Sequence, residues 1–94
     1  MEILLKEDGS KGSATAQDNE KGIGTMTFSI AGKELIIIDS TYVDPEYKGK
    51  GLGKKMLYKI VEMARHKKIK IIPLCPFASA MFRQSDDIRD VLKS

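Results

Sequence analysis

The chain has 94 residues, which predicts a single domain, residues 1–94, near the size at which one hydrophobic core suffices. No segment approaches the ~20 apolar residues that a membrane span needs, so we expect no membrane partner. The N-terminus has neither a basic region nor a cleavage site, and one cysteine cannot form an internal disulfide, so we expect a cytoplasmic protein. One cysteine and one histidine also argue against a structural zinc site.

The net charge of +3 is distributed unevenly along the chain. Residues 48–70 hold nine basic side chains against one acidic side chain, a net charge of +8, whereas the remaining residues hold seven against twelve, a net charge of −5. A concentrated basic segment in an otherwise acidic chain favours an anionic partner. Arg65, His66, Lys67 and Lys68 allow a simpler explanation, because cations are favoured at the C-terminus of a helix.

The first third of the chain predicts short strands joined by turns. Glu7–Gly12 is turn-like, Ser13–Gln17 is predicted as a short edge strand, and Asp18–Lys21 as a hairpin turn. Gly22–Ile30 alternates apolar and polar side chains with the period of a half-buried strand, and Ala31–Lys33 forms the next turn.

A continuous apolar run, Leu35–Ile38, predicts a central strand that is buried on both faces. Its polar continuation, Asp39–Tyr42, leads to Val43 at the carboxyl end, where α/β proteins place their functional sites. Strand ends are also polar simply because they meet solvent, so this strand alone leaves both explanations open.

A periodic helix is predicted from Leu52, with His66 on its polar face as an exposed partner of the helix dipole rather than a catalytic residue. The residues of its apolar half are Leu52, Met56, Leu57, Ile60, Val61, Met63 and Ala64. Ile69–Leu74 is a second apolar strand, and a strand–helix–strand unit of this length makes the two strands parallel.

Cys75 is predicted to cap a helix that opens at Pro76, and Ser85 to cap a final short helix. The residues expected to face inward from these two helices are Phe77, Ala80, Met81, Phe82, Ile88, Val91 and Leu92. The sequence therefore predicts an α/β (α+β) fold, with an antiparallel β-meander followed by a β-α-β crossover and short C-terminal helices.

Three glycines at every second position, within Tyr47–Lys55, stand where the long helix begins. Glycine permits positive φ values, and the free N–H groups of a helix start attract an anion, most naturally phosphate. Neither common nucleotide motif fits: a Walker A loop needs four residues between its glycines and a hydroxyl at Lys55, and a dinucleotide fingerprint needs glycine at Lys54. A glycine-rich turn with a solvated basic face is the alternative.

The spacing that does fit is [Arg/Gln]-x-x-Gly-x-[Gly/Ala], read over Lys48–Gly53. With the preceding strands, this loop resembles the GNAT superfamily of acetyl-coenzyme A-dependent N-acetyltransferases. It is closest to a branch of very small, single-domain GNAT-like proteins with a Cys-x-Phe segment, here Cys75-Pro76-Phe77. The resemblance extends from about Gly22 to the C-terminus, and Lys48 replaces the family's usual Arg or Gln.

The resemblance implies acetyl-coenzyme A as the cofactor. It places the cofactor's pyrophosphate on the backbone amides of the glycine loop and its pantetheine arm beside the backbone of the central strand. The residues implied to bind the cofactor are Tyr42, Val43, Lys48, Gly49, Lys50, Gly51, Leu52, Gly53, Lys54 and Phe77.

Few residues are candidates for the chemistry of acetyl transfer. Cys75, at a helix N-terminus that favours its thiolate, could accept acetyl or protonate the leaving coenzyme A thiolate, or could simply be a small buried hydrophobe. Asp39, Ser40 and Thr41 could orient an acceptor amine or a water molecule. Ser40 stands where the small branch commonly has histidine, so a histidine base is absent there.

Three functions are consistent with these features. The first is transfer of an acetyl group to an amine acceptor, a small molecule or a protein, that the sequence does not identify. The second is a coenzyme A or acyl-coenzyme A binding module with little turnover. The third is a nucleic-acid binder, against which stand the few aromatic side chains and their separation from the lysines.

Overall fold

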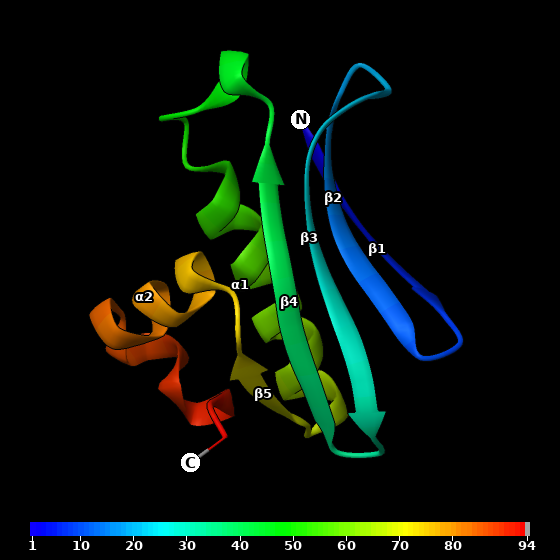
Figure 1. Cartoon of the computed structure of the whole chain (residues 1–94), viewed down its shortest axis with the longest axis vertical. Coiled ribbons are helices and arrows are strands. Elements are labelled where there is room, and N and C mark those ends of the chain that lie inside the picture. Colours follow the sequence, from blue (N-terminus) through cyan, green and yellow to red (C-terminus); the bar gives the residue numbers. More distant parts are fainter. Residues whose placement is uncertain (94) are drawn as a thin grey trace.

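The computed structural model describes residues 1–93 as a five-stranded sheet with strand order β1-β2-β3-β4-β5, together with four helices (Figure 1). The first four strands are antiparallel, and β5 joins β4 in parallel after the crossover through α1. This confirms the predicted fold class and the parallel strand pair. The elements are β1 Glu2–Asp8, β2 Lys11–Asp18, β3 Lys21–Gly32, β4 Leu35–Val43, η1 Pro45–Tyr47, α1 Leu52–Lys67, β5 Lys70–Pro73, α2 Pro76–Gln84 and η2 Asp86–Val91.

The N-terminal strand is the main departure from the sequence-based expectation. Glu7–Gly12 is not one long turn, and Ser13–Gln17 is not an edge strand, because β1 pairs with β2 from Lys11 to Gln17 and only the two residues after Asp8 make the turn. Alternation of apolar and polar side chains does not predict β1, because Leu4 and Leu5 are adjacent in the sequence. Its many charged side chains are typical of a sheet edge, where they discourage pairing with another chain.

The core lies between one face of the sheet and α1, which passes behind the sheet in Figure 1. The predicted apolar half of α1 is buried apart from Met63, which is half-buried. The buried side chains that meet across this interface include Ala14, Ala16, Met26, Phe28, Ile36, Ile38, Met56, Leu57, Ile60 and Val61. Within residues 1–93, no helix is long and apolar enough to cross a membrane.

The second face of the sheet, here called the outer face, is polar. Hydroxyl side chains on neighbouring strands hydrogen-bond across it, with Thr27 and Ser40 2.7 Å apart. Ile37 points to this face and is only half-buried, so the expectation that Leu35–Ile38 is buried on both faces is wrong. Continuous hydrophobicity predicts burial on both faces only where helices cover both, and α1 covers one.

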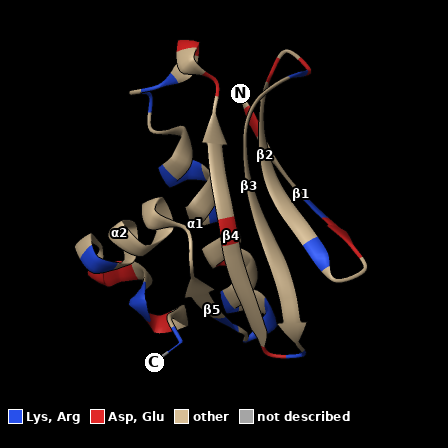
Figure 2. Cartoon of the chain, in the orientation of Figure 1, with Lys and Arg blue, Asp and Glu red and all other residues tan. Residues whose placement is uncertain are grey.

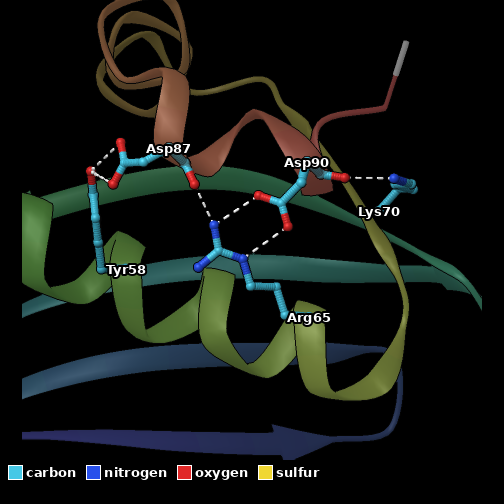
Figure 3. Close-up of polar contacts among 5 residues, drawn as sticks. All are labelled: Tyr58, Arg65, Lys70, Asp87 and Asp90. Atoms are coloured by element: carbon cyan, nitrogen blue, oxygen red, sulfur yellow. Dashed lines mark hydrogen bonds and ion pairs between the residues drawn. The ribbon is translucent and has the colours of Figure 1, made fainter.

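The last helix, η2, is bound to α1 and to β5 by a network of polar and charged side chains (Figure 3). Arg65 donates two hydrogen bonds to the Asp90 carboxylate, at 2.7 and 2.9 Å, and a third to the Asp87 carbonyl. Tyr58 donates to the Asp87 carboxylate, and Lys70 donates to the Asp90 carbonyl at 2.6 Å. The hydrogen bond from Arg65 lowers the pKa of Asp90 below its usual range, and the same contact raises the pKa of Arg65.

The inward side chains of α2 differ from those expected. Ala78 and Phe82 are buried, whereas Phe77 is 38% exposed and Ala80 and Met81 are only half-buried. The buried side of α2 differs from the expected one because the Phe77 ring packs on the first turn of α1 rather than in the core.

The last helix, η2, is a 3₁₀ segment that buries Ile88 and Val91 and leaves Leu92 half-buried. Ser85 makes no side-chain cap, contrary to expectation; its carbonyl accepts the Ile88 N–H instead.

Candidate functional site

A cavity of about 570 Å³ opens where the carboxyl end of β4 meets the glycine loop, the start of α1 and α2. Its lining residues are Thr41, Tyr42, Val43, Pro45, Tyr47, Lys48, Gly49, Gly51, Leu52, Gly53, Lys54, Phe77 and Met81. Nine of the ten residues implied to bind the cofactor are among them. The tenth, Lys50, points its ammonium group at the Tyr47 ring, 5.7 Å from the ring centre. Sequence reasoning missed Pro45, Tyr47 and Met81, although Tyr47 directly precedes the loop.

One wall of the cavity is the free edge of β4. The parallel pairing of β4 with β5 ends at Ile38 opposite Pro73, where the N–H groups of Leu74 and Cys75 both donate to the Ile38 carbonyl. From there β4 continues to Val43 while the chain after β5 turns away into α2, so the two strands diverge (Figure 1). Backbone groups on this side of β4 are therefore available to an extended ligand.

The glycine loop has the backbone that its sequence predicts. Gly49 and Gly51 have φ values of +81° and +76°, and a Cβ atom on either would meet nothing within 4 Å, so the space beside the loop is open. Gly51 caps α1 without a side-chain hydrogen bond, and the first turn of α1 holds no acidic residue. The loop and the start of α1 carry basic residues, in contrast to the acidic turn before them (Figure 2).

These features fit a phosphate group. The N–H groups of a first helical turn have no partner within the helix, and the dipole favours an anion beside them. Lys48 and Lys54 stand at the same opening. The loop therefore offers backbone donors, positive charge and space together.

Gly53 lines the cavity and also serves packing. A Cβ atom at this position would lie 2.5 Å from Cζ of Phe77, so the aromatic ring rests directly on the backbone of α1. This contact turns Phe77 toward the cavity and explains why its side chain is not in the core.

A β-bulge in β4 places candidate catalytic residues on both faces of the sheet. Thr27 of β3 faces Ser40 while Phe28 faces Ile38, which leaves Asp39 as the extra residue. Asp39 and Ser40 consequently both reach the outer face, where the Asp39 carboxylate accepts a hydrogen bond from Ser29 at 2.7 Å. The same bulge coincides with the end of the β4–β5 pairing, as expected for an irregularity that bends a strand.

Thr41 and Cys75 meet on the face that carries α1. Thr41 Oγ1 and Cys75 Sγ share a hydrogen bond of 3.0 Å, and Sγ also accepts the Ala78 N–H at 3.4 Å, which confirms that Cys75 caps α2. Cys75 is 4% exposed and does not line the cavity, whereas Thr41 does. The thiol is therefore buried beside a residue that lines the cavity and contacts the hydroxyl of that residue.

A parallel strand pair that diverges beside a glycine loop and an apolar cavity defines a protein that binds an extended, phosphate-bearing cofactor. Comparison with known proteins identifies the family. The model of the GCN5-related N-acetyltransferases matches residues 13–91. The chain belongs to this family, whose members are acyltransferases that use acetyl-coenzyme A.

Solved structures agree with this assignment. A GCN5-like putative N-acetyltransferase from Staphylococcus aureus is 33% identical, with 97% of this chain and 88% of that chain covered and a TM-score of 0.72. The ribosomal-protein-alanine N-acetyltransferase from Brucella melitensis biovar Abortus 2308 shares the fold at 18% identity, with 82% and 62% covered and a TM-score of 0.70. The chain thus spans 62% of the length of the Brucella protein.

An aminoglycoside 6'-N-acetyltransferase solved with coenzyme A also shares the fold, at 11% identity and a TM-score of 0.60, with 68% of this chain and 37% of that chain covered. A search among proteins with curated descriptions finds no significant match.

Proposed function

We propose that this chain binds acetyl-coenzyme A in the cavity and transfers the acetyl group to an amine. The observation that carries the proposal is the junction of two features in one cavity, the free edge of β4 and the glycine loop at the start of α1. The cofactor, when bound, supplies an acetyl group activated as a thioester. With one free cysteine and no membrane-spanning helix in residues 1–93, the cytoplasm remains the expected compartment.

The binding roles divide along the cavity. The backbone N–H groups of Lys48–Lys54 would hold the pyrophosphate, and the side chains of Lys48 and Lys54 would add charge. The backbone of Tyr42 and Val43 would hydrogen-bond the pantetheine arm as an added strand does. Phe77 and Met81 supply an apolar wall on the opposite side.

The proton-transfer roles follow from burial. Because Cys75 is almost fully buried and hydrogen-bonded to Thr41, its position supports a role as proton donor through the Thr41 hydroxyl more than a role as acetyl acceptor. Sγ is held by the Ala78 N–H, so the thiol and hydroxyl keep a fixed geometry in which a proton can pass between them toward the cavity. On the outer face, Asp39 and Ser40 would orient the acceptor amine.

A binding module with little turnover is the second candidate. No Asp, Glu, His or Cys is among the cavity-lining residues within residues 1–93, so no carboxylate, imidazole or thiol group faces the cavity directly. Family membership alone does not decide between the two candidates, because both need the same cofactor site.

Two measurements separate these functions. Titration of acetyl-coenzyme A into the labelled protein should shift the backbone amides of Tyr42, Val43 and the glycine loop. Incubation with radiolabelled acetyl-coenzyme A and panels of small amines and peptides should then label an acceptor. Binding without label in any acceptor would favour the module. If oligonucleotides at physiological salt shift these amides and coenzyme A does not, the proposal is wrong and the basic segment binds nucleic acid.

A further inference from the structure

A hydrogen bond ties the residue that precedes the glycine loop to the β2–β3 hairpin, which lies at the same end of the sheet as the loop (Figure 1). The Tyr47 hydroxyl donates to the Asp18 carboxylate at 2.9 Å, joining residues that are 29 positions apart in the sequence. Tyr47 is the last residue of η1 and lines the cavity, while Asp18 is the last residue of β2. Asp18 thus belongs to the β2–β3 hairpin, whereas Tyr47 belongs to the segment between β4 and α1.

The loop itself has little internal support. Its two glycines have the widest backbone freedom of any residue, and the hydrogen bond from the Lys48 N–H to the Pro45 carbonyl is long, at 3.4 Å. Lys50 lies over the Tyr47 ring, so the position of that ring also affects where one of the loop's charges stands. Tyr47 is therefore well placed to fix the start of the loop.

The hairpin that holds Tyr47 is itself well ordered. Asp18 pairs with Lys21 across a two-residue turn whose residues both have positive φ, the conformation that matches the twist of paired strands. A bulge in β3 beside this turn leaves Ile23 unpaired with β2, and the Ile23 carbonyl accepts the Asp44 N–H at 2.8 Å. The segment η1 is thus bound to the hairpin before it begins, at Asp44, and at its last residue, Tyr47.

We propose that Tyr47 is a positioning residue which, through its hydrogen bond to Asp18, holds the glycine loop in the conformation that binds the cofactor's phosphates. This inference rests on the proposed function. It assigns part of the cofactor affinity to a hairpin that does not line the cavity. The carboxylate contact also raises the pKa of Tyr47 above its ordinary value of 10.0, in keeping with a phenol that donates to a carboxylate.

The test uses conservative substitutions of both partners in the full chain. Tyr47→Phe keeps the ring under Lys50 and removes only the hydroxyl, and Asp18→Ala removes the acceptor. Each should weaken binding of coenzyme A, measured by calorimetry, by about fivefold, the equivalent of one ordinary hydrogen bond. The double variant should bind no more weakly than either single variant. Asp18→Asn still offers a carbonyl oxygen to the Tyr47 hydroxyl, so its affinity for coenzyme A should stay within about twofold of the wild type.

A matched control is available in the same chain. Tyr58 donates to the Asp87 carboxylate at 3.1 Å, away from the cavity, and Tyr58→Phe keeps its ring under Lys54. This variant should leave affinity for coenzyme A unchanged. Amide hydrogen exchange of the cofactor-free proteins supplies a second readout, because Tyr47→Phe should speed exchange at residues 48–51 and Tyr58→Phe should not.

The outcomes separate this inference from the proposed function. If wild-type protein fails to bind coenzyme A, the proposed function fails, while faster loop exchange in Tyr47→Phe would still support the positioning role. If the wild type binds and folded Tyr47→Phe binds equally well with unchanged loop exchange, the positioning role is overturned. Equal losses in Tyr47→Phe and Tyr58→Phe would overturn it too, since they would reflect general destabilisation.

Discussion

Substitution of Gly51 by valine should abolish cofactor binding and leave the fold intact. Gly51 has a φ value of +76° and lines the cavity, and the space beside its Cα atom is open. A valine side chain would therefore meet no protein atom at its Cβ, but it would project beside the loop where a phosphate would bind. It would also strain the backbone, because β-branched residues rarely adopt positive φ.

The cost to stability follows from that strain. A left-handed conformation costs an L-residue about 1–2 kcal/mol, and the loss of glycine's freedom in the unfolded chain returns at most about 1 kcal/mol. We expect the free energy of unfolding to fall by about 1 kcal/mol, which a small domain tolerates. Binding should fall much further, because the side chain obstructs the site directly.

Gly9→Val provides the matched control. Gly9 lies in the turn between β1 and β2, has a φ value of +64°, and a Cβ atom there would also meet nothing within 4 Å. Urea unfolding should give similar losses of stability for the two variants, and calorimetry with coenzyme A should show lost binding for Gly51→Val alone. Equal affinity in the two folded variants would refute the assignment of the phosphates to this loop.

Three further outcomes can be checked with the same assays. Gly53→Ala should change the free energy of unfolding by less than about 1 kcal/mol, because the better helix propensity of alanine offsets the displacement of the Phe77 ring. Binding of coenzyme A should nevertheless weaken, because that ring moves. Cys75→Ala should lower acetyl transfer about 100-fold or more while affinity for coenzyme A stays the same; undiminished transfer would return Cys75 to a packing role. The hydrogen bond from Arg65 lowers the pKa of Asp90 in the folded protein. The ionised Asp90 therefore stabilises the fold above its ordinary pKa of 3.8, and this stabilisation is lost as pH falls through the lowered pKa. Urea unfolding between pH 2 and pH 6 should therefore show a smaller acid-induced loss in Asp90→Asn than in the wild type, and identical pH profiles would contradict this.

The features that follow directly from side-chain periodicity were predictable from the sequence. The apolar stripe of α1 and the parallel pair that it connects both appear as expected, because burial of that stripe leaves few alternatives. The glycine loop could also be located, since its alternating glycines and lysines precede a helix start. Nine of the ten residues inferred to hold the cofactor line one cavity.

The features that depend on contacts between distant residues were not predictable. The bulge at Asp39 changes which face each later side chain of β4 points to, and a residue count cannot reveal it. Whether Cys75 lines the cavity or is buried beside Thr41 depends on where α2 docks. Similarly, the bond between Tyr47 and Asp18 requires the hairpin and η1 to be adjacent, which the sequence does not indicate.

The bulge in β4 makes the number of residues in this strand important for the site. Without Asp39, the strand would alternate regularly from Ile38 outward to Ser40 and inward to Thr41, so every core contact could be kept. The straightened strand could then continue its ladder along β5, which would occupy the edge that borders the cavity. Deletion of one residue would thus lengthen the pairing of the sheet and remove the site. In alignments of related chains, the number of residues between Ile38 and Thr41 should therefore be more informative about function than their identities.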